Sequence, residues 1–341
     1  MKGAEQSWTR IHCDIDFDRD GKQVSYLQVP HSRNDSAWGV VRIPIMVIKN
    51  GDGPGTLLTG GVHGDEYEGP IALAELARTL TVEAVSGRVI IIPSLHYPAC
   101  VAGARVSPID GRDLNRSFPG DAAGSFAQML AHFVRHRLLP LVTTNIDLHS
   151  GGRSLDCMPC TMSHLLDDAA TLTRTRALAS AFGAPLHVMN REVDGAFTFQ
   201  STAEQLGVIS LSSELGGSGI VSLEGLEIAR RGLRRALAHL GNIDAVLAPL
   251  QTPTRFMEIA AATDYGFAPV SGIYGPRIPL GATVKPGEVL GEIHSMDDPW
   301  REPIPVLASR SGMLWCQRGQ GLISAGDASA VVVAEWMGDQ S

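Results

Sequence analysis

The sequence is poor in basic residues for its length. Lysine and arginine number 28 against 36 aspartates and glutamates, which gives a formal net charge of −8. Binding to nucleic acid or to an anionic membrane surface requires basic patches. The arginine-rich stretches at 174–176 and 230–235 are interpreted as solvated helix faces. We therefore expect neither nucleic acid nor a membrane as a partner.

Long apolar runs and a secretory leader are also missing. No apolar stretch reaches the roughly 18 residues that a membrane-spanning helix needs. Residues 1–19 are polar and lack the apolar segment of a signal peptide. We expect a cytoplasmic protein whose partner is a small molecule, and self-association into a homo-oligomer is left open.

Cysteine is scarce, with five residues in 341. An odd number of cysteines, scattered along a chain without a leader, does not describe a disulfide framework. Cys157 and Cys160 have the spacing of a redox or zinc pair, but no second pair completes a four-thiolate site. We interpret them as buried thiols that line a pocket.

Strand and helix patterns alternate over most of the chain. Strands are predicted at 40–48, 56–59, 87–93, 144–148 and 208–213, and helices at 70–80, 124–139, 168–182 and 222–240. The continuous apolar run at 87–93 is typical of a strand inside a largely parallel sheet. This alternation predicts an α/β fold with a mixed, largely parallel sheet. Because a turn cluster at 50–55 separates the first two strands, we expect them to form a hairpin.

The pattern changes near residue 250. Beyond it, short β-type runs are separated by glycine and proline, which predicts a small all-β domain. The phrase LGATVKPGEVLG (280–291) resembles the turn and strand of biotinyl and lipoyl carrier domains, but SRSG (309–312) has no lysine to modify. We divide the chain into an N-terminal extension (1–38), a catalytic α/β domain (39–250) and a C-terminal β domain (251–341).

The stretch GGVHGDEYEG (60–69) stands where a predicted strand passes into a helix, which is where α/β sheets bind ligands. His63 and Glu66 are three positions apart, so their side chains can point at one place. Two zinc ligands fit that description. A helix cap or a surface hydrogen bond is the alternative for so short a motif.

A third ligand candidate stands at the end of the strand 144–148. His149 precedes a glycine-rich turn, and a His–Glu pair with a later histidine is a recurring catalytic zinc set. Taken alone, His149 is equally a hydrogen-bonded histidine at a strand end. Asp147 is a candidate to support His149 from behind, although it could face away from the ring.

The polar loop at 105–120 carries three arginines. Asn115 and Arg116 are candidates to bind a substrate carboxylate, for which a guanidinium is well suited. Arg105 is the candidate to polarise the scissile carbonyl, with Arg112 as the alternative. The competing interpretation is a solvated surface loop.

Glu214 ends the strand 208–213 before another glycine-rich turn. It has the chemistry of a general base that takes a proton from an attacking water and returns it to the leaving amine. A cap for the next helix is the alternative. Its position at a strand end, like those of the other clusters, favours the base.

Taken in order, HGDE (63–66), DLNRSFPG (113–120), DLHSGG (147–152) and SELGGSG (213–219) resemble the succinylglutamate desuccinylase/aspartoacylase family, which is related to the zinc carboxypeptidases. The resemblance covers roughly residues 40–335. It implies a carboxypeptidase-like sheet with helices on both faces and one Zn²⁺ per subunit. It also implies the site roles, with zinc on His63, Glu66 and His149, Glu214 as base, and Asn115 with Arg116 on the substrate.

Within this family, SRNDSAWG (32–39) and SPID (107–110) are most similar to the deacetylases of ectoine degradation. That similarity implies an amidohydrolase that removes acetate from Nα-acetyl-L-2,4-diaminobutyrate. The alternatives are a succinylglutamate desuccinylase, an aspartoacylase-type deacylase, a carboxypeptidase or a non-catalytic binding module. A substrate ammonium would need an acidic partner, and a second carboxylate would need another arginine, Arg153 or Arg191. The acidic candidates are Asp65, Glu68, Asp110, Asp113, Glu192 and Asp194.

Overall fold

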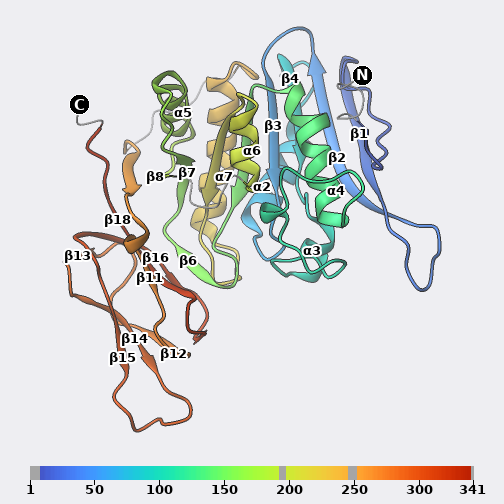
Figure 1. The fold of residues 1–341 in the computed structure, drawn as a ribbon. Helices are drawn as coiled ribbons and strands as arrows, with labels where there is room; N and C mark the ends of the chain where they lie inside the picture. The colour runs from blue at the N-terminus through green and yellow to red at the C-terminus, as the bar shows by residue number, and fades with distance from the viewer. Residues whose placement is uncertain (1–7, 192–196, 245–251, 339–341) are drawn as a thin grey trace.

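The computed structural model describes residues 8–191, 197–244 and 252–338. Its central feature is a mixed sheet that runs through the whole molecule (Figure 1). The strands before the C-terminal region are β1 (Gly21–Pro30), β2 (Val40–Asn50), β3 (Gly55–Gly60), β4 (Gly87–Ile92), β5 (Thr144–His149), β6 (Leu155–Cys157), β7 (Cys160–His164), β8 (Leu186–Asn190) and β9 (Ile209–Glu214).

The middle of this sheet is parallel, as the apolar run at 87–93 predicts. Strands β4, β3, β5 and β9 lie side by side and point the same way. Antiparallel pairs flank them, β2 against β4 on one side and β7 against β9 on the other. Strand β8 then continues parallel to β7. The predicted α/β class with a mixed sheet is confirmed.

Helices cover both faces of the sheet. They are α2 (Glu68–Thr79), α3 (Tyr97–Ala102), α4 (Phe126–Phe133), α5 (Ala169–Phe182), α6 (Phe199–Gln205) and α7 (Leu223–His239). Apolar side chains of α2, α5 and α7 form one buried core with the sheet. Those of α4 and α6 form a second core on the opposite face. Among the described residues, none of the helices combines the length and the apolarity needed to cross a membrane.

The predicted helix at 124–139 is divided in the structure. Helix α4 ends at Phe133 and continues as a π-helical turn over Val134–Leu138, followed by a 3-10 turn over Leu139–Leu141. A second 3-10 turn, Leu114–Arg116, lies in the arginine-bearing loop. Asp113 caps that turn by accepting a hydrogen bond from the backbone N–H of Asn115 at 2.8 Å.

The expected hairpin of β2 with β3 is wrong. Strand β2 pairs with β1 and with β4, whereas β3 pairs with β4 and β5, and the described residues contain no ladder between β2 and β3. The true hairpin is β1 with β2, in register over ten residue pairs from Gly21 to Pro30. Strand β1 alternates exposed and buried side chains, so one face adds to the core.

The C-terminal region is all-β apart from a 3-10 turn at Ala262–Asp264. Its strands are β10 (Arg255–Ile259), β11 (Tyr265–Phe267), β12 (Gly272–Pro276), β13 (Thr283–Val284), β14 (Val289–His294), β15 (Ile304–Leu307), β16 (Gly312–Arg318), β17 (Leu322–Ile323) and β18 (Ala328–Glu335). Figure 1 shows these strands, in orange and red, extending from one end of the main sheet. Strands β15, β14, β12 and β17 form a separate small sheet.

Two ladders join the C-terminal strands to the rest of the chain. Strand β10 pairs in parallel with β8, so it extends the main sheet. Strand β16 pairs with β6, which places Cys316 directly opposite Cys157. Strand β1 lies before the domain limit expected at residue 38, and β10 lies after the limit expected at residue 250, yet both belong to the main sheet. Those limits stay predictions, and 250 lies outside the described residues.

Candidate active site

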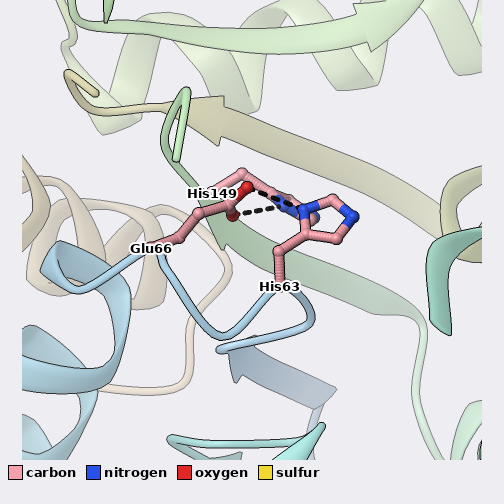
Figure 2. A group of neighbouring side chains, drawn as sticks. All are labelled: His63, Glu66 and His149. Carbon is pink, nitrogen blue, oxygen red and sulfur yellow. Dashed lines mark hydrogen bonds and ion pairs between the residues drawn. The ribbon is translucent and has the colours of Figure 1, made fainter. Parts of the chain in front are cut away.

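Three ligand-type side chains meet at the carboxyl edge of the parallel strands. His63 and Glu66 lie in the loop between β3 and α2, and His149 ends β5. One ligand atom from each lies within 4.8 Å of the others, and all three residues are buried. Figure 2 shows both imidazoles turned toward the carboxylate of Glu66. The structure thus brings together the His–Glu–His cluster that the sequence predicts.

The two imidazoles approach Glu66 through the same type of nitrogen. Nδ1 of His63 lies 2.7 Å from Oε1 of Glu66, and Nδ1 of His149 lies 2.8 Å from Oε2. Gly64 makes the loop possible, because a Cβ at this position would lie 2.0 Å from the carbonyl carbon of Ala99. The loop must therefore carry glycine there to bring the cluster together.

A second carboxylate contacts each imidazole at Nε2, the ring nitrogen that does not face Glu66. Nε2 of His149 lies 2.7 Å from Asp147, whose other oxygen accepts a hydrogen bond of 2.6 Å from the hydroxyl of Thr59. Nε2 of His63 lies 3.2 Å from Asp113. Carboxylates in this position fix the ring orientation of metal-binding histidines. The contact shows that Asp147 faces the ring of His149 and not away from it. Residues two apart on a strand share a face, which explains this orientation.

The pKa values of the cluster reflect these charges. Burial alone lowers the pKa of both histidines, but the neighbouring carboxylates outweigh it and the net shift is upward. Burial raises the pKa of Glu66, and the two histidines reverse this and bring it to about 2. The pKa of Asp113 also lies below its usual range, since His63 and Arg105 outweigh its burial. Glu66 is thus an ionised ligand-type carboxylate.

Glu214 lies beside the cluster. It ends β9, directly opposite His149 on β5, and lines the same cavity. Burial and, to a lesser degree, the negative charge of Glu66 raise the pKa of Glu214 to about 7. Its Oε2 is buried without a hydrogen-bond partner among the described residues. A carboxyl group with this pKa can exchange a proton near neutral pH.

The arginine-bearing loop reaches the same cavity. Arg105, Asn115 and Arg116 all line it. Arg105 donates to Asp113 from Nε at 3.1 Å, which ties this arginine to the support of His63. The side-chain oxygen of Asn115 accepts a hydrogen bond from the backbone N–H of Phe199 at 2.9 Å. This hydrogen bond fixes the oxygen of the Asn115 amide.

The cavity has a volume of about 310 Å³ and is closed in part by the C-terminal strands. Tyr265, Trp315, Cys316, Ala328 and Val331 line it from that region. Cys157 lines it too, whereas Cys160 is fully buried and is not part of the lining. The prediction that both thiols are buried is confirmed, and the prediction that they line a pocket is confirmed for Cys157 alone. A cavity of this size suits a small molecule.

Several sequence candidates lie elsewhere. Asp65 accepts from the backbone of Arg153, Glu68 from that of Ser222, and Asp110 from that of Ala127. Among the described residues, the cavity lining includes no aspartate or glutamate from the candidate set for an ammonium, and Glu192 and Asp194 lie outside the described residues. It likewise includes none of the other arginines considered, Arg112, Arg153 and Arg191.

Sequence reasoning missed the wall of the cavity that α6, β7, β8 and β9 form. It consists of Met162, His164, Asn190, Thr198, Gln200 and Ser212. Strands β7 and β8 and helix α6 are too short to give a clear periodic signal. The contact of Asp113 with His63 was also missed, because the two residues are fifty positions apart.

Comparison with known proteins decides the family. Residues 52–240 match the family described as "Succinylglutamate desuccinylase/Aspartoacylase catalytic domain". The chain belongs to this family.

Two solved members share its fold and much of its sequence. A succinylglutamate desuccinylase/aspartoacylase from Rhodobacter sphaeroides is 46% identical with a TM-score of 0.92, covering 96% of this chain and 99% of that one. The product-bound ectoine utilization protein EutE (DoeB) from Ruegeria pomeroyi is 41% identical, with the same TM-score and coverage. Among characterised sequences, the N-alpha-acetyl-L-2,4-diaminobutyric acid deacetylase of Halomonas elongata is 40% identical over 96% of both chains. The resemblance expected from the four motifs is confirmed.

Proposed function

We propose that the chain is a metal-dependent deacetylase that hydrolyses Nα-acetyl-L-2,4-diaminobutyrate to L-2,4-diaminobutyrate and acetate, the reaction expected for ectoine degradation. The observation that carries this proposal is the His–Glu–His cluster with Glu214 beside it, in a cavity sized for a small molecule. The relatives named for this deacetylase activity and for ectoine utilization support the choice of substrate.

The residues of the cluster fit a zinc ion. Nδ1 of His63, a carboxylate oxygen of Glu66 and Nδ1 of His149 converge, and two imidazoles with one carboxylate are a frequent ligand set of catalytic zinc. These three residues would hold one Zn²⁺ per subunit. Zinc in such a site lowers the pKa of a water and polarises a carbonyl group.

Glu214 is the general base in this proposal. Its raised pKa suits it to accept a proton from the attacking water at neutral pH and to return that proton to the departing amine. Arg105 stabilises the negative charge that develops on the carbonyl oxygen. Asn115 and Arg116 bind the α-carboxylate, for which the guanidinium of Arg116 supplies paired N–H donors. All four side chains line one cavity.

The composition of the cavity favours this substrate over the alternatives. Arg105 and Arg116 are its only cationic side chains other than histidines among the described residues, which leaves no further arginine for the second carboxylate of succinylglutamate or N-acetylaspartate. The C-terminal strands narrow the cavity, so a peptide does not fit as it would in a carboxypeptidase. The presence of ligands and base together speaks against a non-catalytic binding module.

Two further expectations accompany this proposal. The C-terminal region is a biotinyl/lipoyl-type barrel that limits access to the cavity. The enzyme acts in the cytoplasm. Self-association into a homo-oligomer is left open and is measured separately.

A substrate panel tests the function. Zinc-loaded enzyme is assayed for acetate or amine release from Nα-acetyl-L-2,4-diaminobutyrate, its Nγ-acetyl isomer, Nα-succinylglutamate and N-acetylaspartate, with a chelated sample as the control. We expect preference for the first substrate, with activity abolished by the chelator. Preference for another acyl amino acid would overturn the assigned substrate, and turnover that survives chelation would overturn the metal mechanism.

A further inference from the structure

The wall of the cavity formed by β9 and α6 has polar groups that the proposed chemistry does not use. Ser212 lies on β9 two residues before Glu214, and Gln200 lies on α6 above it; both line the cavity. The hydroxyl of Ser212 lies 3.4 Å from Oε1 of Gln200. The side chain of Ser212 lies on the same side of β9 as Glu214, because residues two apart on a strand share a face, and Oε1 of Gln200 contacts it there.

A partly buried carboxylate orients this wall. Oε1 of Glu204 accepts a hydrogen bond of 3.0 Å from Nε2 of Gln200, and Oε2 lies 2.6 Å from Nδ1 of His164. An ionised carboxylate can only accept hydrogen bonds, so the NH₂ end of Gln200 must face Glu204. The carbonyl end of the same amide therefore faces Ser212 and the cavity.

The carboxylate of this wall is paired with a histidine. Among the described residues, the ion pair of Glu204 is with His164, and no lysine or arginine contacts its carboxylate. The two arginines of the cavity, Arg105 and Arg116, belong to the loop at 105–120, which contacts the first residue of α6 through Asn115. The cavity thus combines cationic side chains from that loop with an accepting oxygen and a nearby carboxylate from α6. Such an arrangement recognises a molecule with a carboxylate at one end and an ammonium at the other.

We propose that Gln200 and Ser212 bind the side-chain ammonium of the substrate, and that Glu204 acts as the positioning residue for Gln200. This inference rests on the proposed function and names the part of the site that selects the amino acid. None of the acidic candidates that the sequence offered for this role lines the cavity within the described residues.

The spacing along β9 agrees with the length of the substrate. Two residues of a strand span about 7 Å, which is the separation expected between the backbone positions of Ser212 and Glu214. In an extended Nα-acyl diaminobutyrate, roughly 6 Å separates the acyl carbon from the side-chain nitrogen. A substrate whose acyl carbon lies beside Glu214 therefore brings its ammonium to the level of Ser212 and Gln200.

The test compares two substrates of equal shape. Nα-acetyl-L-norvaline carries a methyl group where Nα-acetyl-L-2,4-diaminobutyrate carries the ammonium. We expect zinc-loaded wild type to prefer the charged substrate in kcat/KM. Gln200→Leu and Glu204→Gln should lower kcat/KM for the charged substrate roughly 10- to 100-fold, the effect of one lost charge-assisted hydrogen bond. The kcat/KM of the norvaline compound should stay at the wild-type value in these variants. A purely structural role of the two residues would instead lower kcat/KM for both compounds.

Matched variants keep the result interpretable. Glu224→Gln removes an exposed carboxylate from α7 and should leave the preference at the wild-type value. Ser212→Ala is a smaller change, for use if Gln200→Leu or Glu204→Gln does not fold, and it should reduce the preference in the same direction. A preference that survives Gln200→Leu, Glu204→Gln and Ser212→Ala would overturn the inference, as would a preference lost only in Glu192→Gln or Asp194→Asn.

The two proposals fail in different ways. If wild type hydrolyses neither compound, the proposed function is overturned and this inference falls with it. If wild type hydrolyses Nα-acetyl-L-2,4-diaminobutyrate and these three variants keep its preference over the norvaline compound, only the assignment of Gln200, Ser212 and Glu204 is overturned.

Discussion

Asp147 holds the ring of His149 from two residues earlier on the same strand, with 2.7 Å between its Oδ2 and Nε2 of the imidazole. The hydroxyl of Thr59 on the neighbouring strand fixes the other carboxylate oxygen. The orientation of His149 toward Glu66 therefore depends on a contact that is local in sequence and supported across the sheet.

Loss of that carboxylate should weaken metal binding. We expect Asp147→Asn to reduce zinc affinity by about 10- to 100-fold, as replacement of carboxylates behind metal-binding histidines usually does. Competition with a chromophoric chelator measures the affinity. Asp52→Asn, in an exposed turn, is the control and should bind zinc like wild type. Equal affinities in all three proteins would contradict the role given to Asp147.

Arg116 and Arg105 should differ in the kinetic constant that they change. If Arg116 binds the substrate carboxylate in both ground and transition states, Arg116→Ala raises KM and leaves kcat nearly unchanged. Arg105 acts on charge that develops during the reaction, so Arg105→Lys should lower kcat. Steady-state kinetics on the preferred substrate separates the two. The opposite pattern would exchange their roles.

His187 predicts how stability depends on pH. The residue is fully buried on β8, where its ring nitrogens contact the hydroxyls of Thr161 and Ser163. Burial and the charge of Arg176 lower its pKa to about 3. Between about pH 6.5 and 3 the unfolded chain binds a proton that the folded chain excludes. This residue therefore makes the fold less stable as the pH falls through that range.

At pH 5 the effect of His187 amounts to about 2 kcal/mol in the free energy of unfolding. His187→Gln should consequently lose less stability than wild type between pH 7.5 and pH 5, even if it is less stable at pH 7.5. Urea unfolding at both values measures this. His239→Gln, at the exposed end of α7, serves as the control. An equal loss in wild type and His187→Gln would show that this histidine does not titrate as described.

The sequence predicts the catalytic edge of the sheet well because strands and glycine turns are local signals. His63, His149 and Glu214 each follow an apolar strand, and parallel strands bring such ends to one edge. The periodic helices at 70–80, 168–182 and 222–240 correspond to α2, α5 and α7 within two residues at each end. Local pattern is sufficient for these elements.

Pairing between strands is where the local pattern fails. A turn cluster after β2 favoured a hairpin with β3, but β4 lies between these strands in the sheet. The pairing of β1 with β2 depends on burying one face of β1, which an isolated strand pattern does not reveal. Likewise, Glu204 and Gln200 belong to a helix of seven residues, and their relation to Ser212 exists only once α6 packs over β9.

The most direct test of the account is the rate of Glu214→Gln with its zinc content measured in the same sample. The account predicts that the metal stays bound and that kcat/KM for Nα-acetyl-L-2,4-diaminobutyrate falls by roughly 10²- to 10⁴-fold, the usual contribution of a general base. A zinc-loaded Glu214→Gln enzyme that works at a rate close to wild type would contradict it.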